Sequence, residues 1–500
     1  MQKSKIVIAI LVLAVFLTAF ITVGNLNALE EGANSDDEET SQQSAEKGLL
    51  PFPTSVGIGA VTIGDQMYTR IRLLPEFRFW KFRLGLDFDI LMDSNGKIRE
   101  KDWDDFEDYL NKILYLQFAQ RQDPFYFRLG GFSDLKFGHG LIMNDYTNML
   151  NYPDVKQLGA EVAVNTNLYG LGFDVFSSNL ERNDLLAGRI TLNPFQFSNI
   201  PLIENMKVGA TAVTDRDQFS TIRARKEDYF PDKAEDMDED DWLYVWELIN
   251  GDSTGFNNWY EEHEDSLHIH DYPENLDEEK EVTELGLDYT LPLINTKTFS
   301  LYNYGEYAKI LDYGHGFVFP GFGAEFLIFN AQLDYRLFGE EFQANYFNRL
   351  YDDERARVEN DTMLVTKAST LNGLSKSQGW RGMLAANILD FVTVSMEYED
   401  ITGDNYPVGK SIMAGVRLNK TLIPQIAYAY AKYSQVNVEE IQKWKSPNAS
   451  IDAQVGYNLS SNSLLIWEYR EHYIDKNDDG EIKGSNETVS SYSLGVQLRL

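Results

Sequence analysis

Residues 491–500, with the sequence SYSLGVQLRL, show the pattern from which the fold class is inferred. Small or polar residues alternate there with five large apolar ones, which are Tyr492, Leu494, Val496, Leu498 and Leu500. Because successive side chains of a β-strand point to opposite faces, the stretch predicts a strand with one apolar and one polar face. A soluble sheet and a membrane barrel both contain such strands, so the rest of the chain has to distinguish them.

The same alternation recurs along most of the chain, for example in residues 82–90, 158–164, 169–175, 392–398 and 426–430. A single run is a weak signal for a membrane-spanning strand, and its repetition carries the prediction. We expect about twenty strands, with starts near residues 54, 66, 81, 112, 124, 157, 169, 185, 204, 282, 297, 322, 341, 377, 391, 410, 422, 449, 463 and 488.

The links between these strands differ according to their position in the series. After every even-numbered strand the link is short or modest, as in residues 79–80, 166–168 and 389–390. Nearly all long links follow odd-numbered strands. They are residues 93–111, 134–156, 215–281, 312–321, 351–376, 435–448 and 475–487. One end of the predicted sheet therefore carries tight turns, and the other end carries the insertions.

This asymmetry, together with the C-terminal strand, resembles bacterial outer-membrane β-barrel, porin-like proteins, although Leu500 stands where such barrels usually end in an aromatic residue. The resemblance covers about residues 50–500. It implies an all-β, transmembrane, antiparallel up-and-down barrel of 18–20 strands, with short helices in its external loops. It further implies the outer membrane as location, periplasmic termini, insertion by the barrel-assembly machinery, and a monomer or a homo-trimer.

The N-terminal region predicts export. Lys3 and Lys5 precede the uncharged, mostly apolar residues 6–23, so residues 1–28 read as a secretory signal peptide, with an uncleaved membrane anchor as the alternative. Residues 29–50 are acidic and polar with little to bury, which predicts a disordered linker. The barrel is expected over residues 51–500, with an acidic external insertion at about 215–281.

The composition excludes several functional classes. With 44 basic and 78 acidic residues, the chain is not expected to bind nucleic acid, because phosphate binding requires a basic face. The absence of cysteine excludes disulfides and thiolate chemistry. No nucleophile motif such as Gly-x-Ser-x-Gly is present, so an enzyme is not expected.

Charged residues gather on one face of the first predicted strands, and a further one, Arg128, lies on a later strand. An outward Arg or Lys near the bilayer midplane would cost about 2–4 kcal/mol, so these residues are expected to face the lumen. They predict a water-filled pore with a basic patch that favours anions, as in a passive diffusion channel for small hydrophilic solutes. The predicted pore-lining residues are Arg70, Arg72, Glu76, Arg78, Lys81, Arg83, Asp87, Asp89 and Arg128.

Two alternatives remain open at this point. The charged residues can instead form Arg–Asp pairs that fill the lumen. The barrel would then be a largely closed structural or surface-display protein, with an acidic and cation-binding external surface. Lumen size distinguishes the two, since a barrel of sixteen or more strands leaves an aqueous channel unless loops fill it.

Two nearly repeated motifs, Gly138-His139-Gly140 and Gly314-His315-Gly316, fall on the side of the long links. Paired glycines permit tight backbone bends, so we expect two loops that pack into the barrel mouth. The alternative is a shared ligand or metal site formed by His139 and His315.

Calcium is the one cofactor that the sequence suggests. Asp475, Asn477, Asp479 and Glu481, with Gly480, match the first part of an EF-hand loop, but position twelve is Asn486 instead of a bidentate Glu. Asp93 begins a shorter fragment of the same kind. Amphipathic spacing predicts helices at residues 99–112 and 242–249, and His263, His268 and His270 lie among carboxylates that suit a divalent metal.

Overall fold

The computed structural model contains a compact unit over Leu50–Leu500, and its conformation is described for most of the residues from 55 to 499. The predicted signal peptide and linker lie outside the described residues, as does most of the predicted helix at 99–112. Residues 225–272, which include the predicted helix at 242–249 and the three histidines, also lie outside them. The described residues are 55–63, 66–99, 103, 112–152, 155, 157–166, 168–224, 273, 275–359, 363–389, 391–404, 409–418, 423–438, 440–446, 448–460, 463–473, 482 and 487–499.

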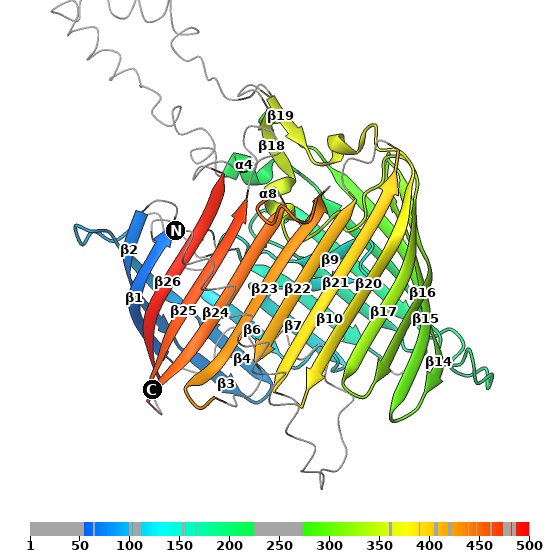
Figure 1. Ribbon diagram of the computed structural model, residues 1–500, viewed down its shortest axis with the longest axis horizontal. Helices are drawn as coiled ribbons and strands as arrows, with labels where there is room; N and C mark the ends of the chain where they lie inside the picture. The colour runs from blue at the N-terminus through cyan, green and yellow to red at the C-terminus, as the bar shows by residue number, and fades with distance from the viewer. Residues whose placement is uncertain are drawn as a thin grey trace, which may run out of the picture. The chain divides into compact units, whose positions relative to one another are not determined.

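One antiparallel sheet of 22 strands forms the body of the protein (Figure 1). Each strand pairs with its neighbours, and the last strand pairs with the first from Ser55↔Arg499 to Ile63↔Ser491, so the pairings form a closed ring. The chain runs from one end of the barrel to the other in a series of passes. Two of these passes are each divided into two strands, at Pro75 and at Asp87, so the 22 described strands of the sheet correspond to twenty passes. The predicted up-and-down β-barrel of about twenty strands is confirmed.

The strands of the first part of the ring are β1 (Ser55–Ile63), β2 (Gln66–Leu74), β3 (Glu76–Phe79), β4 (Phe82–Leu86), β5 (Phe88–Met92), β6 (Ile113–Phe118), β7 (Phe125–Gly130), β10 (Gly159–Asn165), β11 (Gly172–Ser177), β12 (Leu185–Leu192) and β13 (Lys207–Asp215). Those of the second part are β14 (Val282–Asn295), β15 (Phe299–Ile310), β16 (His315–Phe326), β17 (Phe329–Phe338), β20 (Ser377–Ile388), β21 (Val392–Gly403), β22 (Lys410–Leu418), β23 (Ile426–Val438), β24 (Ala449–Ser460), β25 (Ser463–Tyr473) and β26 (Thr488–Arg499).

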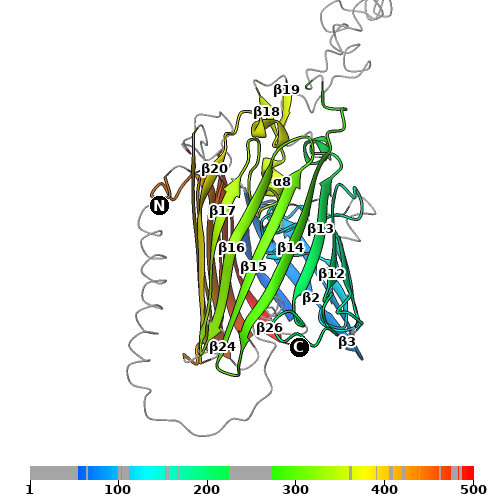
Figure 2. The ribbon, with the colours of Figure 1, turned by 90° about the vertical axis from the view of Figure 1, so that its right-hand side faces the viewer.

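The remaining elements of the described residues are small and belong to links between strands of the barrel, with α4, β18 and β19 at one end of it (Figures 1 and 2). They are β8 (Leu135–Phe137), β9 (Met143–Tyr146), α4 (Ser220–Ala224), α8 (Tyr351–Glu354), β18 (Ala356–Glu359), β19 (Met363–Thr366) and the 3-10 helix η3 (Ala368–Leu371). No helix in the described part of the chain is long and apolar enough to cross a membrane.

The two ends of the barrel differ as the sequence predicted. The longest links, at residues 93–112, 131–158, 216–281 and 339–376, all lie at one end, called here the long-link end. At the other, short-turn end several turns need only two or three residues, for example Leu327–Ile328, where Leu327 has φ 52°. Ser55 and Arg499 also lie at the short-turn end, because both strands of the closing pair begin or finish there.

Two predicted strand positions were wrong. The twelfth and thirteenth passes were expected to start near residues 322 and 341, but they are β16 and β17. Residues 341–351 instead enter the lumen. Their aromatic side chains are buried there at both even and odd positions of the sequence. A segment buried on all sides has no polar face, so its sequence periodicity does not distinguish it from a strand.

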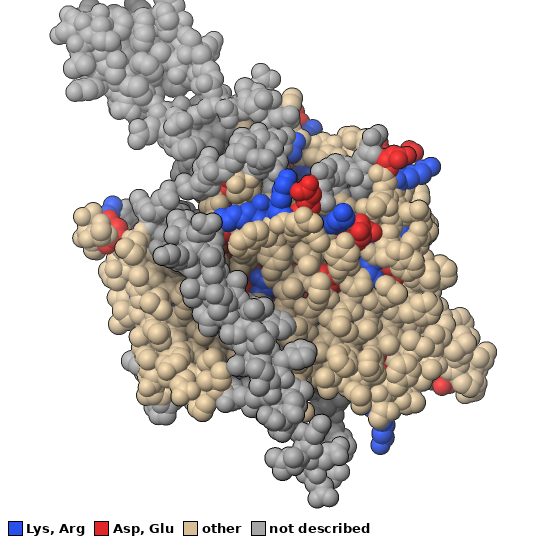
Figure 3. Space-filling view, viewed as in Figure 1, with Lys and Arg blue, Asp and Glu red and all other residues tan. Residues whose placement is uncertain are grey.

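The outer face of the barrel is apolar. Exposed large side chains occupy alternate strand positions, as with Leu285 and Leu287 on β14 and Leu494 and Val496 on β26. Uncharged side chains cover most of the visible band of strands, whereas the visible charges gather mainly toward the long-link end (Figure 3). Such a belt suits the acyl-chain region of a bilayer.

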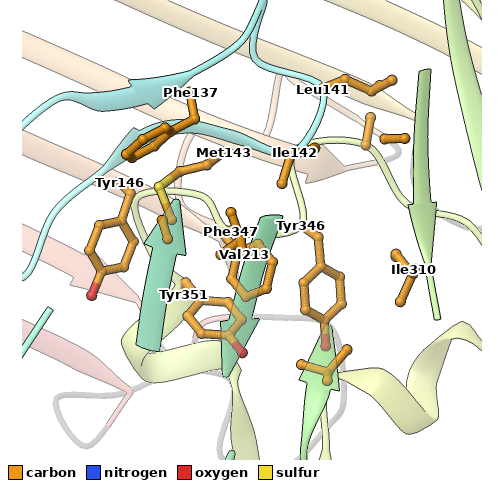
Figure 4. Packing of buried hydrophobic residues seen from close by; sticks show 14 of the residues in the cluster. Phe137, Leu141, Ile142, Met143, Tyr146, Val213, Ile310, Tyr346, Phe347 and Tyr351 are labelled. Atoms are coloured by element: carbon orange, nitrogen blue, oxygen red, sulfur yellow. The ribbon is translucent and has the colours of Figure 1, made fainter. Parts of the chain in front are cut away.

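The main hydrophobic core lies inside the barrel. Two links fold back into the lumen, residues 131–158 and residues 339–376, and are called here the first and second inward segments. They meet where Met143 bridges Phe347, and they pack on wall residues such as Val213 and Ile310 (Figure 4). These segments determine how much of the lumen stays open.

Candidate functional site

The arginines at the start of the barrel are paired with aspartates of the next pass. Arg70 Nε donates to both carboxylate oxygens of Asp89, at 2.9 and 3.0 Å, and its Nη2 lies 2.6 Å from Asp89 Oδ2. Arg72 binds Asp87 in the same two-pronged way, at 2.8 and 3.0 Å. A charge-assisted pair with two parallel hydrogen bonds is among the stronger polar contacts in proteins, and it fixes both side chains.

The first inward segment covers these two pairs through Tyr152. Its hydroxyl donates to Asp87 Oδ2 at 2.5 Å and also contacts Arg72. Its backbone oxygen accepts a hydrogen bond of 2.6 Å from Arg470 Nη1 on β25. The guanidinium of Arg470 lies 5.0 Å from the centre of the Tyr152 ring, within the range of a cation–π contact. Tyr152 therefore joins the inward segment to two nearby parts of the charged wall, the β2–β5 pair and β25, which are separated only by β26 and β1.

The other predicted pore-lining residues form a row across neighbouring strands. Arg78 is opposite Arg83, Arg83 is opposite Gln117, and Gln117 is opposite Arg128. The guanidinium groups of Arg83 and Arg128 lie 5.6 and 5.8 Å from the centre of the Tyr115 ring.

Two of the predicted residues lie apart from this row. Lys81 lies in the turn after β3, 3.5 Å from Asp123, with both side chains exposed at the short-turn end. Glu76 lies on β3 opposite Gly85. The role of the whole predicted set as the lining of an open path stays a prediction.

A second charged cluster was not predicted. Lys432 on β23 contacts Asp134 and Asp145 of the first inward segment. Arg349 of the second inward segment contacts Asp452 on β24 and lies 3.6 Å from Asp145. The cluster ties both inward segments to the wall formed by β23 and β24.

The two aspartates of this cluster differ in their ionisation. Burial opposes ionisation of Asp134, but the charge of Lys432 outweighs it and holds the pKa of that carboxyl below its usual range. Burial raises the pKa of Asp145 to about 6, against the charge of Lys432. Negative charge is thus concentrated on Asp134, which is also the more exposed of the two side chains.

Further ion pairs line the wall beside the inward core. Arg381 on β20 lies 3.0 Å from Asp334 on β17 and 2.6 Å from Glu397 on β21. Arg336 shares Asp334, at 2.8 Å, and also contacts Glu399. These side chains are buried or nearly so, and they cancel one another's charge.

The two Gly-His-Gly motifs do not meet. His139 lies in the lumen, stacks on Tyr304 at 4.4 Å between ring centres, and lies 3.2 Å from the backbone oxygen of Tyr289. His315 is exposed at the start of β16, where its ring lies beside Tyr307 and Phe317. The loop that contains His139 does pack inside the barrel, as predicted, but the alternative of a shared site was wrong.

The metal predictions fall mostly outside the described residues. Asp475, Asn477, Asp479 and Glu481 are all in that category, so their calcium site stays a prediction. In the shorter fragment, the carboxylate of Asp93 accepts the backbone N–H groups of Asn95 and Lys97, both at 2.8 Å, as in an ordinary turn. Among the described residues no group of three or more His, Asp or Glu side chains is arranged to hold a metal ion.

Several solved structures are similar to this chain, and all have low sequence identity. Wzi of Escherichia coli is described as an outer membrane, carbohydrate-binding β-barrel involved in group 1 capsule assembly. It has 10% identity and a TM-score of 0.34, with 92% of this chain and 86% of that chain covered. OccK5 (OpdH) of Pseudomonas aeruginosa has 8% identity and a TM-score of 0.29, with coverages of 89% and 95%.

A triple mutant of the Rhodopseudomonas blastica porin has 7% identity and a TM-score of 0.24, and the match covers 89% of this chain and 98% of that chain. Neither a protein-family model nor a curated protein matches the chain. The similarity to the solved structures concerns the fold.

Proposed function

We propose that the protein is a porin-like barrel of the outer membrane that lets small hydrophilic solutes diffuse through a narrow polar passage. The passage runs between the two inward segments and the wall formed by β21–β26. The supporting observation is the partial exposure of charged side chains on that side of the lumen. The exposed fractions are 25% for Lys432, 25% for Arg470, 26% for Glu468 and 34% for Asp134.

The part of the wall from β13 to β17 supports the same route by being sealed. There the inward segments pack on Val213, Ile310 and Phe338, and all three side chains are buried. A dry apolar contact of this kind excludes ions and hydrated solutes, because a charge in an apolar interior loses its hydration without compensation. Solutes would therefore be confined to the charged side.

The charges along the passage predict a weak ion preference. At its edge, where Arg70 lies 3.5 Å from Glu468 on β25, Asp89 and Asp87 neutralise Arg70 and Arg72. Within the passage, the acidic Asp134 faces the basic Lys432. Paired charges leave little net field along a pore, so neither anions nor cations are strongly excluded. The proposal includes no catalysed reaction.

The apolar outer face supports this location. An apolar belt around a closed ring of strands leaves no unpaired strand edge in the bilayer, which is the requirement for a membrane-spanning sheet. With the long-link end external and the short-turn end periplasmic, the barrel-assembly machinery would insert the chain as a monomer or as part of a homo-trimer.

Single-channel recording in planar bilayers tests the proposal. The parent should give small, stable conductance steps. Lys432→Met should shift the ion preference toward cations, because Asp134 and Asp145 then lose a partner beside the passage. The matched control is Lys309→Met, which removes a lysine from an exposed position of β15, opposite His315, and should leave conductance and preference unchanged.

A closed, surface-display barrel is the second candidate. The dense packing of Phe342, Tyr346, Phe347 and Tyr351 inside the lumen favours it, since such a core leaves no room for water. Silent bilayers from well-folded protein would select this candidate over the channel.

A further inference from the structure

The wall of the barrel differs in height around the ring. In one part of the ring, β14, β15 and β16 contain 14, 12 and 12 residues. The strands β10, β11 and β12, which only β13 separates from them, contain 7, 6 and 8 residues. A transmembrane strand needs about 9–11 residues at a tilt of about 45°. The second group is too short to cross the hydrocarbon region by itself.

The deficit can be estimated from strand geometry. Six residues of strand span about 20 Å at about 3.3 Å per residue. At a tilt of about 45° they cover about 14 Å along the bilayer normal, whereas the apolar band of such barrels is about 25 Å tall. The bilayer must thin locally here, or other apolar groups must continue the belt.

Two links at the short-turn end, next to these short strands, carry the apolar groups that the strands lack. They are residues 166–171, between β10 and β11, and residues 193–206, between β12 and β13. Glu204 is the only charged residue in the two links. Their exposed large apolar side chains, called here the ledge, are Leu168, Tyr169, Phe195, Phe197, Ile200 and Leu202.

The two links are held together as one ordered surface. The backbone N–H of Asn193 donates to the oxygen of Tyr169 at 2.6 Å, and the rings of Tyr169 and Phe197 meet edge to face at 5.0 Å. Within the longer link, Ser198 N–H donates to Phe195 at 2.9 Å and Glu204 N–H donates to Ile200 at 2.9 Å. The apolar side chains therefore point outward from a folded link.

The ledge also continues the apolar outer face of the strands above it. Phe173 and Val175 on β11 and Ile190 on β12 are exposed on that face. An exposed apolar patch of this extent marks an interaction surface. Its continuity with the lipid-facing belt identifies the partner as the same bilayer.

We propose that the ledge is embedded in the membrane leaflet at the short-turn end, where it completes the hydrophobic belt beneath the short strands β10–β12. Aromatic and aliphatic side chains with almost no charge fit the boundary between lipid headgroups and acyl chains. The inference requires the barrel to lie in a membrane, but it is independent of whether the lumen conducts.

Single-cysteine spin labelling of the full chain in lipid vesicles tests this proposal. The parent contains no cysteine, so Phe197→Cys and Ile200→Cys each give one labelled site. Collision rates with oxygen, which concentrates in lipid, and with a water-soluble nickel chelate report the surroundings of each label. Leu287→Cys on the belt is the lipid-facing control, and Lys297→Cys in the turn after β14 is the water-facing control at the same end.

We expect the labels at 197 and 200 to resemble the label at 287, with an oxygen-to-nickel collision ratio severalfold above that at 297. A ratio equal to that at 297 for both positions would overturn the proposal, since the ledge would then lie in water. Protection from both reagents would also overturn it, because a protein partner would then cover the ledge. Circular dichroism of each labelled variant verifies that the barrel has formed.

Discussion

Arg355 and Asp215 form a fully buried ion pair between the second inward segment and the barrel wall, with 2.6 Å between Arg355 Nη2 and Asp215 Oδ1. Arg355 follows α8 directly, and Asp215 is the last residue of β13. The same guanidinium reaches Asp184 at 2.8 Å, so one arginine holds the link before β12 and the end of β13. The position of the second inward segment depends on this contact.

Removing Arg355 should release that segment. Arg355→Met leaves two buried carboxylates without their cation, a loss that typically costs about 3–5 kcal/mol of folding free energy. Urea unfolding from vesicles should show a loss of this size, and single-channel recordings should show larger, fluctuating steps. The exposed pair Lys376–Glu340, at 3.8 Å, provides the control: Lys376→Met should cost less than about 1 kcal/mol. Equal effects of the two substitutions would contradict the anchoring role.

Neutralising the basic patch should change ion selectivity. With Arg70, Arg72 and Arg83 replaced by Gln, Asp87 and Asp89 lose their cations, and the preference in reversal-potential measurements should move toward cations. Adding Asp87→Asn and Asp89→Asn removes the unpaired charges and should return the preference close to the parent. An unchanged reversal potential in the first variant would place the solute path away from these pairs.

Asp352 on α8 gives a prediction about pH. Burial raises its pKa from 3.8 to about 6, against the charge of Arg355. Because the folded protein favours the protonated form, stability should fall as pH rises from about 4 to about 6 and stay lower above that range. The contribution is about 3 kcal/mol at most, at 1.36 kcal/mol per pKa unit. Asp352→Asn should flatten this part of the pH profile in urea unfolding, whereas Asp93→Asn, in an exposed turn, should leave it in place.

Calcium should bind weakly at the loop between β25 and β26. Asp475, Asn477 and Asp479 supply alternating oxygens, but Asn486 replaces the bidentate Glu, so we expect a dissociation constant in the range of about 0.1–1 mM. Isothermal titration of the detergent-solubilised protein should show a site that Asp475→Ala with Asp479→Ala abolishes. Calcium binding that survives in the double variant would assign the ions to the acidic insertion at residues 215–281.

Sequence periodicity was sufficient for the barrel because its strands have one polar and one apolar face. The parity of the links then separated the two ends, and twenty passes were placed with two exceptions. Both exceptions adjoin the second inward segment, where Phe342, Tyr346 and Phe347 are buried on all sides. Period-two alternation arises where a strand separates an apolar environment from a polar one. A segment that is buried on all sides has only an apolar environment, so its sequence does not alternate.

The charged site was predictable only in part. Arg70 and Asp89 lie on adjacent passes, so alternation alone placed them on the same face. The contact between Lys432 and Asp134 joins residues that are 298 positions apart. It exists because the first inward segment folds across the lumen, and no local pattern encodes that path. The sequence contained one indication of this cluster, which is Lys432 itself. It is a single lysine among the lumen-facing residues of β23, between Tyr430 and Ser434.

The most direct test of the proposed passage is charged thiol modification of two neighbouring positions during single-channel recording. Ser395 and Met396 are consecutive exposed residues of β21. Ser395 shares the inward row with Glu397, and Met396 lies on the outer face. In Ser395→Cys, a positively charged methanethiosulfonate reagent should reduce the conductance and shift the preference toward anions, whereas Met396→Cys should not respond. Equal responses at the two positions, or silent bilayers from folded protein, would contradict a solute passage along β21–β26.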